Sequence, residues 1–300
     1  FIMKIFRNRS KDIHLSDKQP LSIAGYVSIV ISYVILIAWS FVVLWPLLQI
    51  VVTTFNGNQY DFVDVNSSNY EFSLKHFQFL FNETKYLMWV KNTIFISIST
   101  ALLTVIMVSF TGYVYSRFRF KGRKPTLIAI MLIQTIPTFA GITAYFTIYS
   151  IVNDLLPIFS RQMMLILIYS GGGIATNTFI LKGYLDSIST ELDDAGKIDG
   201  CSYMQIYRLI IMPIAKPMLA IIALWSFIGP FMDFLLPRVL LSEESYTLAA
   251  GLWTLINNER NFNQPAFVTG GFLTAIPIVL MFIFLQKYLV SGLAKGSVKG

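Results

Sequence analysis

The sequence has few of the residues that build catalytic and metal centres. Its 300 residues include one cysteine, Cys201, and two histidines, His14 and His76, which are far apart in the chain. A single cysteine excludes a disulfide framework and a cysteine-based zinc or iron–sulfur site. No Ser/His/Asp arrangement and no paired carboxylates stand out either. The sequence therefore predicts neither a catalytic centre nor a metal site.

A phosphate-binding loop of the Gly-x-x-x-x-Gly-Lys-Ser/Thr type is also missing. The run Gly171-Gly172-Gly173 falls inside an apolar stretch, and no lysine follows it. Such a loop needs the lysine to reach the phosphates. If this chain works with ATP, the nucleotide and its magnesium are expected on a different polypeptide.

Charge is scarce, and this scarcity indicates the class of protein. Charged residues make up 13% of the chain and apolar residues 55%, and the mean hydropathy is +0.63. A soluble domain of this size has too little polar surface to cover so many apolar side chains. The composition predicts an all-α, polytopic membrane protein in the lipid bilayer. Its first apolar stretch is too long for a cleavable signal peptide and lacks a small-residue cleavage pattern.

Windows without charge predict the membrane spans, because a helix needs roughly 20 apolar residues to cross the hydrocarbon core. About six such windows occur. They cover residues 22–50, 92–116, 126–150, 162–181, 217–240 and 266–288, and the fifth is interrupted by Asp233.

The basic residues predict the orientation. They gather in the amino-terminal tail (1–21), in the connections 117–124 and 182–216, and at the carboxyl end (287–300). Lysine and arginine accumulate on the cytoplasmic side of membrane proteins. Both termini are therefore predicted to be cytoplasmic. Basic residues beside apolar runs determine topology, so the net charge of +7 does not indicate nucleic-acid binding.

The connection between the fourth and fifth spans is the most informative segment. It is too polar to span and too long for a simple turn. Thr190 and Asp193 have the spacing of a capping box, with Ser187 and Ser189 as further N-cap candidates, and Asp199-Gly200 is a turn signal. A second helix is expected from the helical spacing of Tyr203, Ile206, Tyr207 and Ile210. The two predicted helices and the turn between them form an elbow (residues 187–213). Such an elbow suits docking on a soluble partner or lying on the bilayer surface, or it simply orders the loop.

These residues resemble a motif of permease subunits of ATP-binding-cassette (ABC) importers. The family pattern is Glu-Ala-Ala, three residues, Gly, nine residues, Ile, one residue, Leu-Pro. This chain has Asp194-Ala195-Gly196, then Gly200, Ile210 and Met212-Pro213 at the same spacing. It departs from the pattern in Asp for Glu, Gly for the second Ala, and Met for Leu.

The resemblance implies a type I importer fold and a coupling helix at about 187–200 that docks on an ATPase subunit. It implies a role in coupling to the ATPase for the residues of the motif and its acidic flank: Glu191, Asp193, Asp194, Ala195, Gly196, Asp199, Gly200, Ile210 and Pro213. The implied partners are a second, homologous permease, two ABC ATPases and an extracellular sugar-binding protein. The implied location is the plasma membrane of a bacterium.

Two further segments resemble permeases of maltose- and maltodextrin-type importers, and the second of them resembles the smaller permease in particular. One is the run 227–234, with Tyr246-Thr247-Leu248 and Gly251-Leu252 after it. The other is the glycine-punctuated tail 290–300, which implies ATPase contacts for Gly292, Leu293, Gly296 and Lys299. Maltodextrin-like oligosaccharides are the implied substrate.

Asp233 is the only ionisable residue well inside a predicted span, where a carboxylate is costly and is a functional candidate. It could bind sugar hydroxyls with Phe234, cap a broken helix after Pro230, or form an ion pair with Arg238. Farther on, Trp253, Asn257 and Asn258 have a composition that suits carbohydrate. In the resembled family this loop meets the binding protein, but a plain aromatic belt explains it too.

Three other functions stay open at this stage. A permease for another oligosaccharide fits the same motif. An ion-coupled secondary transporter would need more intramembrane carboxylates than Asp233 and an internal repeat. A membrane-embedded enzyme would need convergent catalytic groups, and none are evident.

Overall fold

The computed structural model describes residues 23–57, 70–257 and 262–296. Within these ranges the chain is helical apart from short connections and one isolated bridge between Asn56 and Phe72. The all-α prediction is confirmed. The predicted tail 1–21 lies outside the described residues.

Helix α2 (Ile23–Thr54), as far as Val52, forms one unit, and the chain from Thr53 onward forms a second. The sequence of α2 is mostly apolar, and two of its serines donate hydrogen bonds to carbonyls of the same helix. The hydroxyls of Ser32 and Ser40 donate to the carbonyls of Ser28 and Leu36 (2.8 and 2.7 Å). Back-bonding of this kind satisfies a hydroxyl without water.

Five helical stretches are long and apolar enough to cross a membrane. They are α2, α4 (Tyr86–Arg117), α7 (Arg161–Asp186), the continuous run 203–232, and α13 (Gln264–Gly296) as far as Tyr288. They coincide with the first, second, fourth, fifth and sixth predicted spans. Each extends beyond at least one predicted bound, because helices continue past the apolar core into polar flanks. The run 203–232 nevertheless ends before the predicted residue 240.

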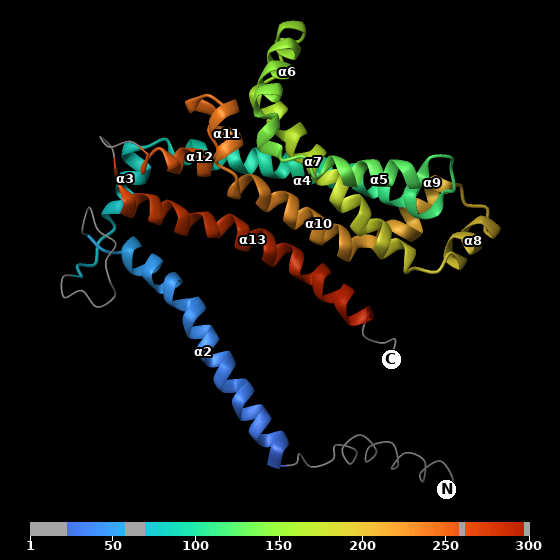
Figure 1. Cartoon of the computed structure of the whole chain (residues 1–300), viewed down its shortest axis with the longest axis horizontal. Helices are drawn as coiled ribbons and strands as arrows, with labels where there is room; N and C mark the ends of the chain where they lie inside the picture. The colour runs from blue at the N-terminus through green and yellow to red at the C-terminus, as the bar shows by residue number, and fades with distance from the viewer. Residues whose placement is uncertain (1–22, 58–69, 258–261, 297–300) are drawn as a thin grey trace. The chain divides into compact units, whose positions relative to one another are not determined.

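The predicted third span, 126–150, is not a single helix. The structure divides this region into α5 (Arg123–Ile133), the 3₁₀ turn η1 (Thr138–Gly141) and α6 (Ile142–Leu155). Figure 1 shows α6 leaving the direction of α5 at a steep angle. The break precedes Pro137, which lacks an N–H and disfavours helical geometry in the residue before it.

The interruption of the fifth span is confirmed. Helix α10 (Met212–Met232) ends at Asp233, and the short helix α11 (Leu235–Leu240) follows. The span begins before the predicted residue 217, because helical structure runs on from Tyr203.

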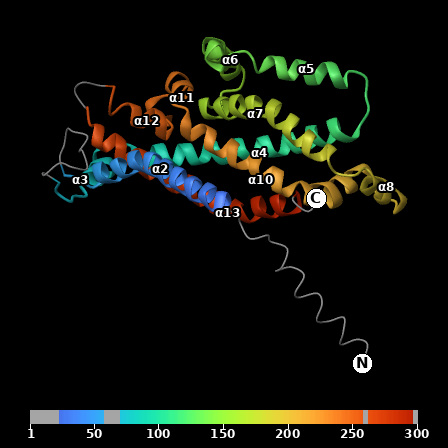
Figure 2. The same cartoon turned by 60° about the horizontal axis from the view of Figure 1, so that its bottom comes forward.

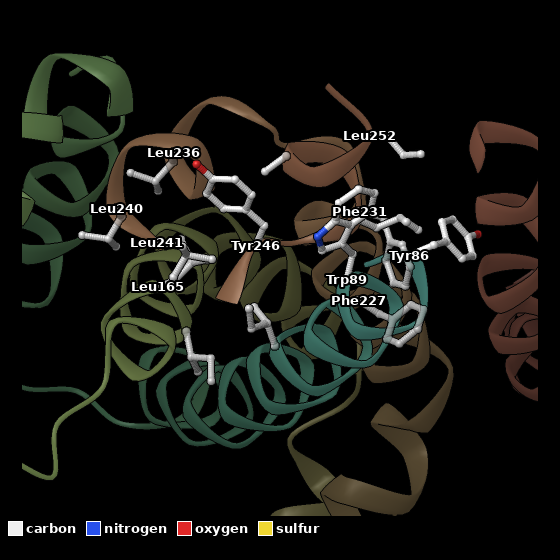
Figure 3. Close-up of a cluster of buried hydrophobic side chains, with 14 of the residues drawn as sticks. Tyr86, Trp89, Leu165, Phe227, Phe231, Leu236, Leu240, Leu241, Tyr246 and Leu252 are labelled. Carbon is white, nitrogen blue, oxygen red and sulfur yellow. The ribbon is translucent and has the colours of Figure 1, made fainter. Parts of the chain in front are cut away.

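Helix α4 lies at the centre of the second unit and packs against α7 and α10. A cluster of buried side chains joins Tyr86 and Trp89 of α4 to Phe227 and Phe231 of α10 and to Leu165 of α7 (Figure 3). Helices α11 and α12 (Leu248–Trp253) add Leu236, Leu240 and Leu252 to the same cluster.

Small and hydroxylated residues let α4 approach α7 closely. A Cβ atom on Gly112 would lie 2.8 Å from Cδ2 of Leu181, so only glycine fits there without rearrangement. The hydroxyls of Thr111 and Thr178 pair across the same interface at 2.7 Å. Close approach through small residues is how helices associate in lipid.

The second unit has two distinct ends. Figures 1 and 2 both place α3 (Lys75–Glu83) and α12 at one end and α8 (Glu191–Ile198) at the other. The α8 end carries the segment that the sequence singled out.

Candidate docking site for a partner protein

The predicted elbow is present as two helical pieces joined at a glycine. Helix α8 is followed by Asp199 and Gly200, and then by α9 (Tyr203–Gln205), which continues into the π-helix η2 (Ile206–Ile211) and α10. The predicted helix–turn–helix is therefore confirmed, with α8 shorter than the predicted 187–200.

Gly200 makes the turn. Its φ of +80° lies in the left-handed region, which glycine adopts without steric cost. The N–H of Gly200 donates to the carbonyl of Lys197 (3.0 Å), and that of Cys201 donates to Gly196 (2.9 Å). These bonds satisfy carbonyls that the end of α8 would leave unpaired.

The predicted capping box of Thr190 and Asp193 is wrong. Thr190 makes no side-chain cap, and the Asp193 carboxylate turns inward to Arg117. The Ser189 hydroxyl instead accepts from the N–H of Glu191 (3.2 Å).

A complete capping box lies at Ser202 and Gln205, at the start of the second helix. The N–H of Ser202 donates to the Gln205 side chain (2.7 Å), and the N–H of Gln205 donates to Ser202 Oγ (3.4 Å). Its Ser-x-x-Gln pattern was a readable signal in the sequence.

Arg117, the last residue of α4, anchors the elbow. Its Nε lies 2.9 Å from Oδ2 of Asp193, and both side chains are more than nine-tenths buried. The contact is an ion pair rather than a well-aligned hydrogen bond. The other two guanidinium nitrogens donate to the carbonyls of Leu185 (3.1 Å) and Ile188 (3.2 Å). One side chain thus holds the end of α7, the connection and α8.

Gly196 allows α8 to pack closely against the π-helix. A Cβ atom there would lie 2.9 Å from Cδ1 of Ile210 and 3.1 Å from Cγ1 of Ile206. The π-helix buries Ile206, Tyr207 and Ile211. Of the four residues whose helical spacing predicted this second helix, Tyr203 is exposed. Pro213 follows the π-helix and removes one backbone N–H, which disturbs the regular ladder just before it.

The outward face of α8 is both acidic and apolar. Glu191, Asp194 and Asp199 are exposed together with Ala195 and Leu192. Ile198, which lies outside the spanning helices, is 87% exposed, and together with Leu192 it gives this face its apolar component. Lys197 donates to Asp194 (2.9 Å), and this hydrogen bond raises the pKa of the Lys197 ammonium.

Seven of the nine predicted coupling residues fall into two groups. Glu191, Asp194, Ala195, Asp199 and Gly200 are exposed and available to a partner. Asp193 and Gly196 are buried and serve to hold α8 in place. Ile210 is half-buried beneath Gly196, and Pro213 begins α10.

The family model of the binding-protein-dependent transport system inner membrane component matches residues 109–295, which include this elbow. The chain belongs to this family.

Curated relatives resemble the permease over nearly its whole length. The maltodextrin transport system permease protein of Bacillus subtilis (strain 168) is 41% identical over 93% of this chain and 99% of its own. That of Streptococcus pneumoniae (strain ATCC BAA-255 / R6) is 37% identical over 90% and 95%. The galactooligosaccharides transport system permease protein of Bacillus subtilis (strain 168) is 38% identical over 93% and 99%.

A solved structure shares the fold. The crystal structure of a bacterial ABC transporter involved in the import of the acidic polysaccharide alginate contains a chain that superposes with a TM-score of 0.71. It is 21% identical, and the match covers 90% of this chain and 99% of that one.

Asp233 occupies the break between α10 and α11 in the permease. Its Oδ1 accepts from the N–H groups of Leu235 (2.9 Å) and Leu236 (3.3 Å), and its Oδ2 accepts from the Tyr169 hydroxyl (2.9 Å). The capping alternative is therefore confirmed. The alternative ion pair is wrong, because Arg238 bonds to the Tyr246 hydroxyl instead and stacks over that ring.

Phe234 and Trp253 were expected in different roles but lie together. Their rings stack with centroids 4.7 Å apart and planes 23° from parallel. They come from the break after α10 and from the end of α12, and sequence spacing gives no signal for this pairing. Asn257 is exposed, and Asn258 lies outside the described residues.

The predicted tail begins as helix. Helix α13 continues through Gly292, Leu293 and Gly296, whereas Lys299 lies outside the described residues. As to metals, the described ranges contain no cluster of three or more His, Cys, Asp or Glu side chains that could hold an ion.

Proposed function

We propose that this permease is the smaller transmembrane subunit of a bacterial ABC importer for maltodextrin-like oligosaccharides. Two maltodextrin permeases at 41% and 37% identity, each matched over at least nine-tenths of its length, support this substrate class. The galactooligosaccharides relative, at 38%, makes another oligosaccharide the second candidate.

The observation that carries the proposal is the elbow at α8. Its motif spacing and its exposed acidic and apolar face suit docking on a separate ATPase, which would bind ATP and magnesium. Glu191, Asp194, Ala195, Asp199 and Gly200 form the contact face. Alternating access would follow from rigid-body movement of the helical unit, driven by contacts that differ between two states.

The proposal includes an orientation and an assembly. Six spans, with α5 and α6 together making the third, put both termini and α8 in the cytoplasm of a bacterium, as the positive-inside rule predicts. A second, larger permease, two ATPases and an extracellular sugar-binding protein complete the importer. Gly292, Leu293, Gly296 and Lys299 would reach the ATPases.

The opposite end of the permease would face the substrate. Asp233 and Phe234 lie at a helix break, a feature that in transporters marks substrate paths. Trp253, Asn257 and Asn258 would meet the binding protein. The stack of Phe234 on Trp253 supports a shared role, because aromatic faces suit the apolar face of a sugar ring.

The test is affinity purification of the chain from its native membrane, followed by reconstitution of the copurified subunits in liposomes. We expect an ABC ATPase and a second permease to copurify, and maltotriose uptake to require ATP and the binding protein. Uptake driven by an ion gradient without ATP would overturn the proposal. Uptake of galactooligosaccharides alone would favour the second candidate.

A further inference from the structure

Helix α8 is held to the rest of the permease by two different contacts. One is the apolar packing of Gly196 against Ile206 and Ile210 of the π-helix. The other is the Arg117 side chain, which reaches Asp193 of α8 from the end of α4. The four residues 187–190 that link α7 to α8 contain no helix, so they transmit little force by themselves.

Arg117 differs from the other basic residues near it. Its side chain is 7% exposed and that of Asp193 is 8% exposed. Arg119, only two residues on, is exposed and makes no ion pair among the described residues. A buried guanidinium is tolerated only when it is paired and its donors are used. Arg117 meets this condition through Asp193 and the carbonyls of Leu185 and Ile188.

The arrangement joins three elements at one point. The planar guanidinium fork can serve several acceptors at fixed angles, which a lysine ammonium does less well. The end of α4, the end of α7 and the inner face of α8 therefore keep a defined relation to one another. Helix α4 in turn is the central helix of the second unit and packs on both α7 and α10.

We propose that Arg117 is a positioning residue that transmits movement of α8 to α4, and so couples partner docking to rearrangement of the bundle. The inference rests on the proposed function, because it assigns the route by which work received at the elbow reaches the transmembrane helices. Arg117 and Asp193 do not contact the partner; they act through the exposed face of α8.

The test compares Arg117→Lys and Asp193→Asn with the unaltered permease in the reconstituted, complete importer. Asp193→Asn preserves the size of the side chain, and Arg117→Lys preserves the positive charge beside Asp193, so it guards against misfolding. The readouts are copurification of the ATPase, ATP hydrolysis stimulated by the sugar-loaded binding protein, and maltotriose transported per ATP hydrolysed. The controls are Arg119→Lys, at an exposed arginine, and Asp154→Asn, at an exposed aspartate of α6.

We expect Arg117→Lys and Asp193→Asn to copurify with the ATPase and to hydrolyse ATP, while sugar transported per ATP falls by about fivefold or more. The two control variants should keep the ratio of the unaltered permease. An unchanged ratio in Arg117→Lys, or loss of ATPase copurification in that variant, would overturn the inference and leave Arg117 a purely structural residue. Failure of the unaltered permease to bind any ATPase would instead overturn the proposed function.

Discussion

Gly196 of α8 lies directly against Ile210 of the π-helix, so closely that a Cβ atom on Gly196 would stand 2.9 Å from Cδ1 of Ile210. Both belong to the motif that the sequence pattern identified. Their relation explains part of the motif in physical terms: a small residue at one position receives the branched side chain of the other. The pair holds α8 on the π-helix while its opposite face stays exposed.

The size of the side chain at position 196 should therefore determine whether α8 stays packed against the π-helix. We expect Gly196→Ala to be tolerated, because the nearest atom is the movable end of the Ile210 side chain. Gly196→Leu should cost ~1–3 kcal/mol by overpacking. Thermal unfolding of the purified permease in detergent measures the difference. Equal stability of the leucine and alanine variants would contradict the packing described.

Gly200 should tolerate asparagine better than valine. A Cβ atom there would meet nothing within 4 Å, so the cost of substitution comes from its φ of +80° alone. A non-glycine residue pays ~1–2 kcal/mol in this region, a β-branched one more, and asparagine less. Gly200→Val should uncouple ATP hydrolysis from maltotriose uptake while the helices still assemble, and Gly200→Asn should retain much of the uptake. Normal uptake by the valine variant would count against a coupling role for the turn.

The carboxylate of Asp233 should stabilise the permease by capping α11. We expect Asp233→Ala to lower the free energy of unfolding by ~0.5–2 kcal/mol, the usual cost of losing an N-cap. Asp233→Asn keeps a capping oxygen and should lose less. If Asp233→Asn unfolds as early as Asp233→Ala but keeps full uptake, capping does not explain the stability. If it unfolds normally but requires more maltotriose for half-maximal uptake, Asp233 also contributes to the substrate path.

Gly251 should not accept even a methyl group. Its Cβ would lie 2.1 to 2.5 Å from ring atoms of Trp89, whose buried ring cannot move aside. Gly251→Ala should therefore push α12 from α4 and lower stability by ~1–3 kcal/mol. Gly271→Ala is the matched control, because a Cβ atom there meets nothing within 4 Å. Similar unfolding temperatures for the two variants would show that α12 does not pack on Trp89 in this way.

Features set by the local sequence could be predicted. Charge-free windows located five spanning helices, and Asp199-Gly200 located the turn at the end of α8. The elbow was predictable because its polarity, its turn and its motif spacing all lie within one short stretch.

Features set by distant residues could not be predicted. The role of Asp193 depends on Arg117, which is 76 positions away, and this long-range ion pair replaced the capping box expected from local spacing. The stack of Phe234 on Trp253 likewise depends on how α12 folds back. Pro137 was visible as a helix-perturbing residue, but whether it bends a span or divides it depends on the neighbours of α5 and α6.

The most direct test places a photo-crosslinking amino acid at Ile198, whose side chain is 87% exposed on the outward face of α8. Illumination of intact cells should link the permease to an ABC ATPase, whereas the same probe at the exposed Leu156, before α7, should not. An Ile198 probe that links only to lipid or to extracellular proteins, in cells where the importer is active, would contradict a docking role for the elbow.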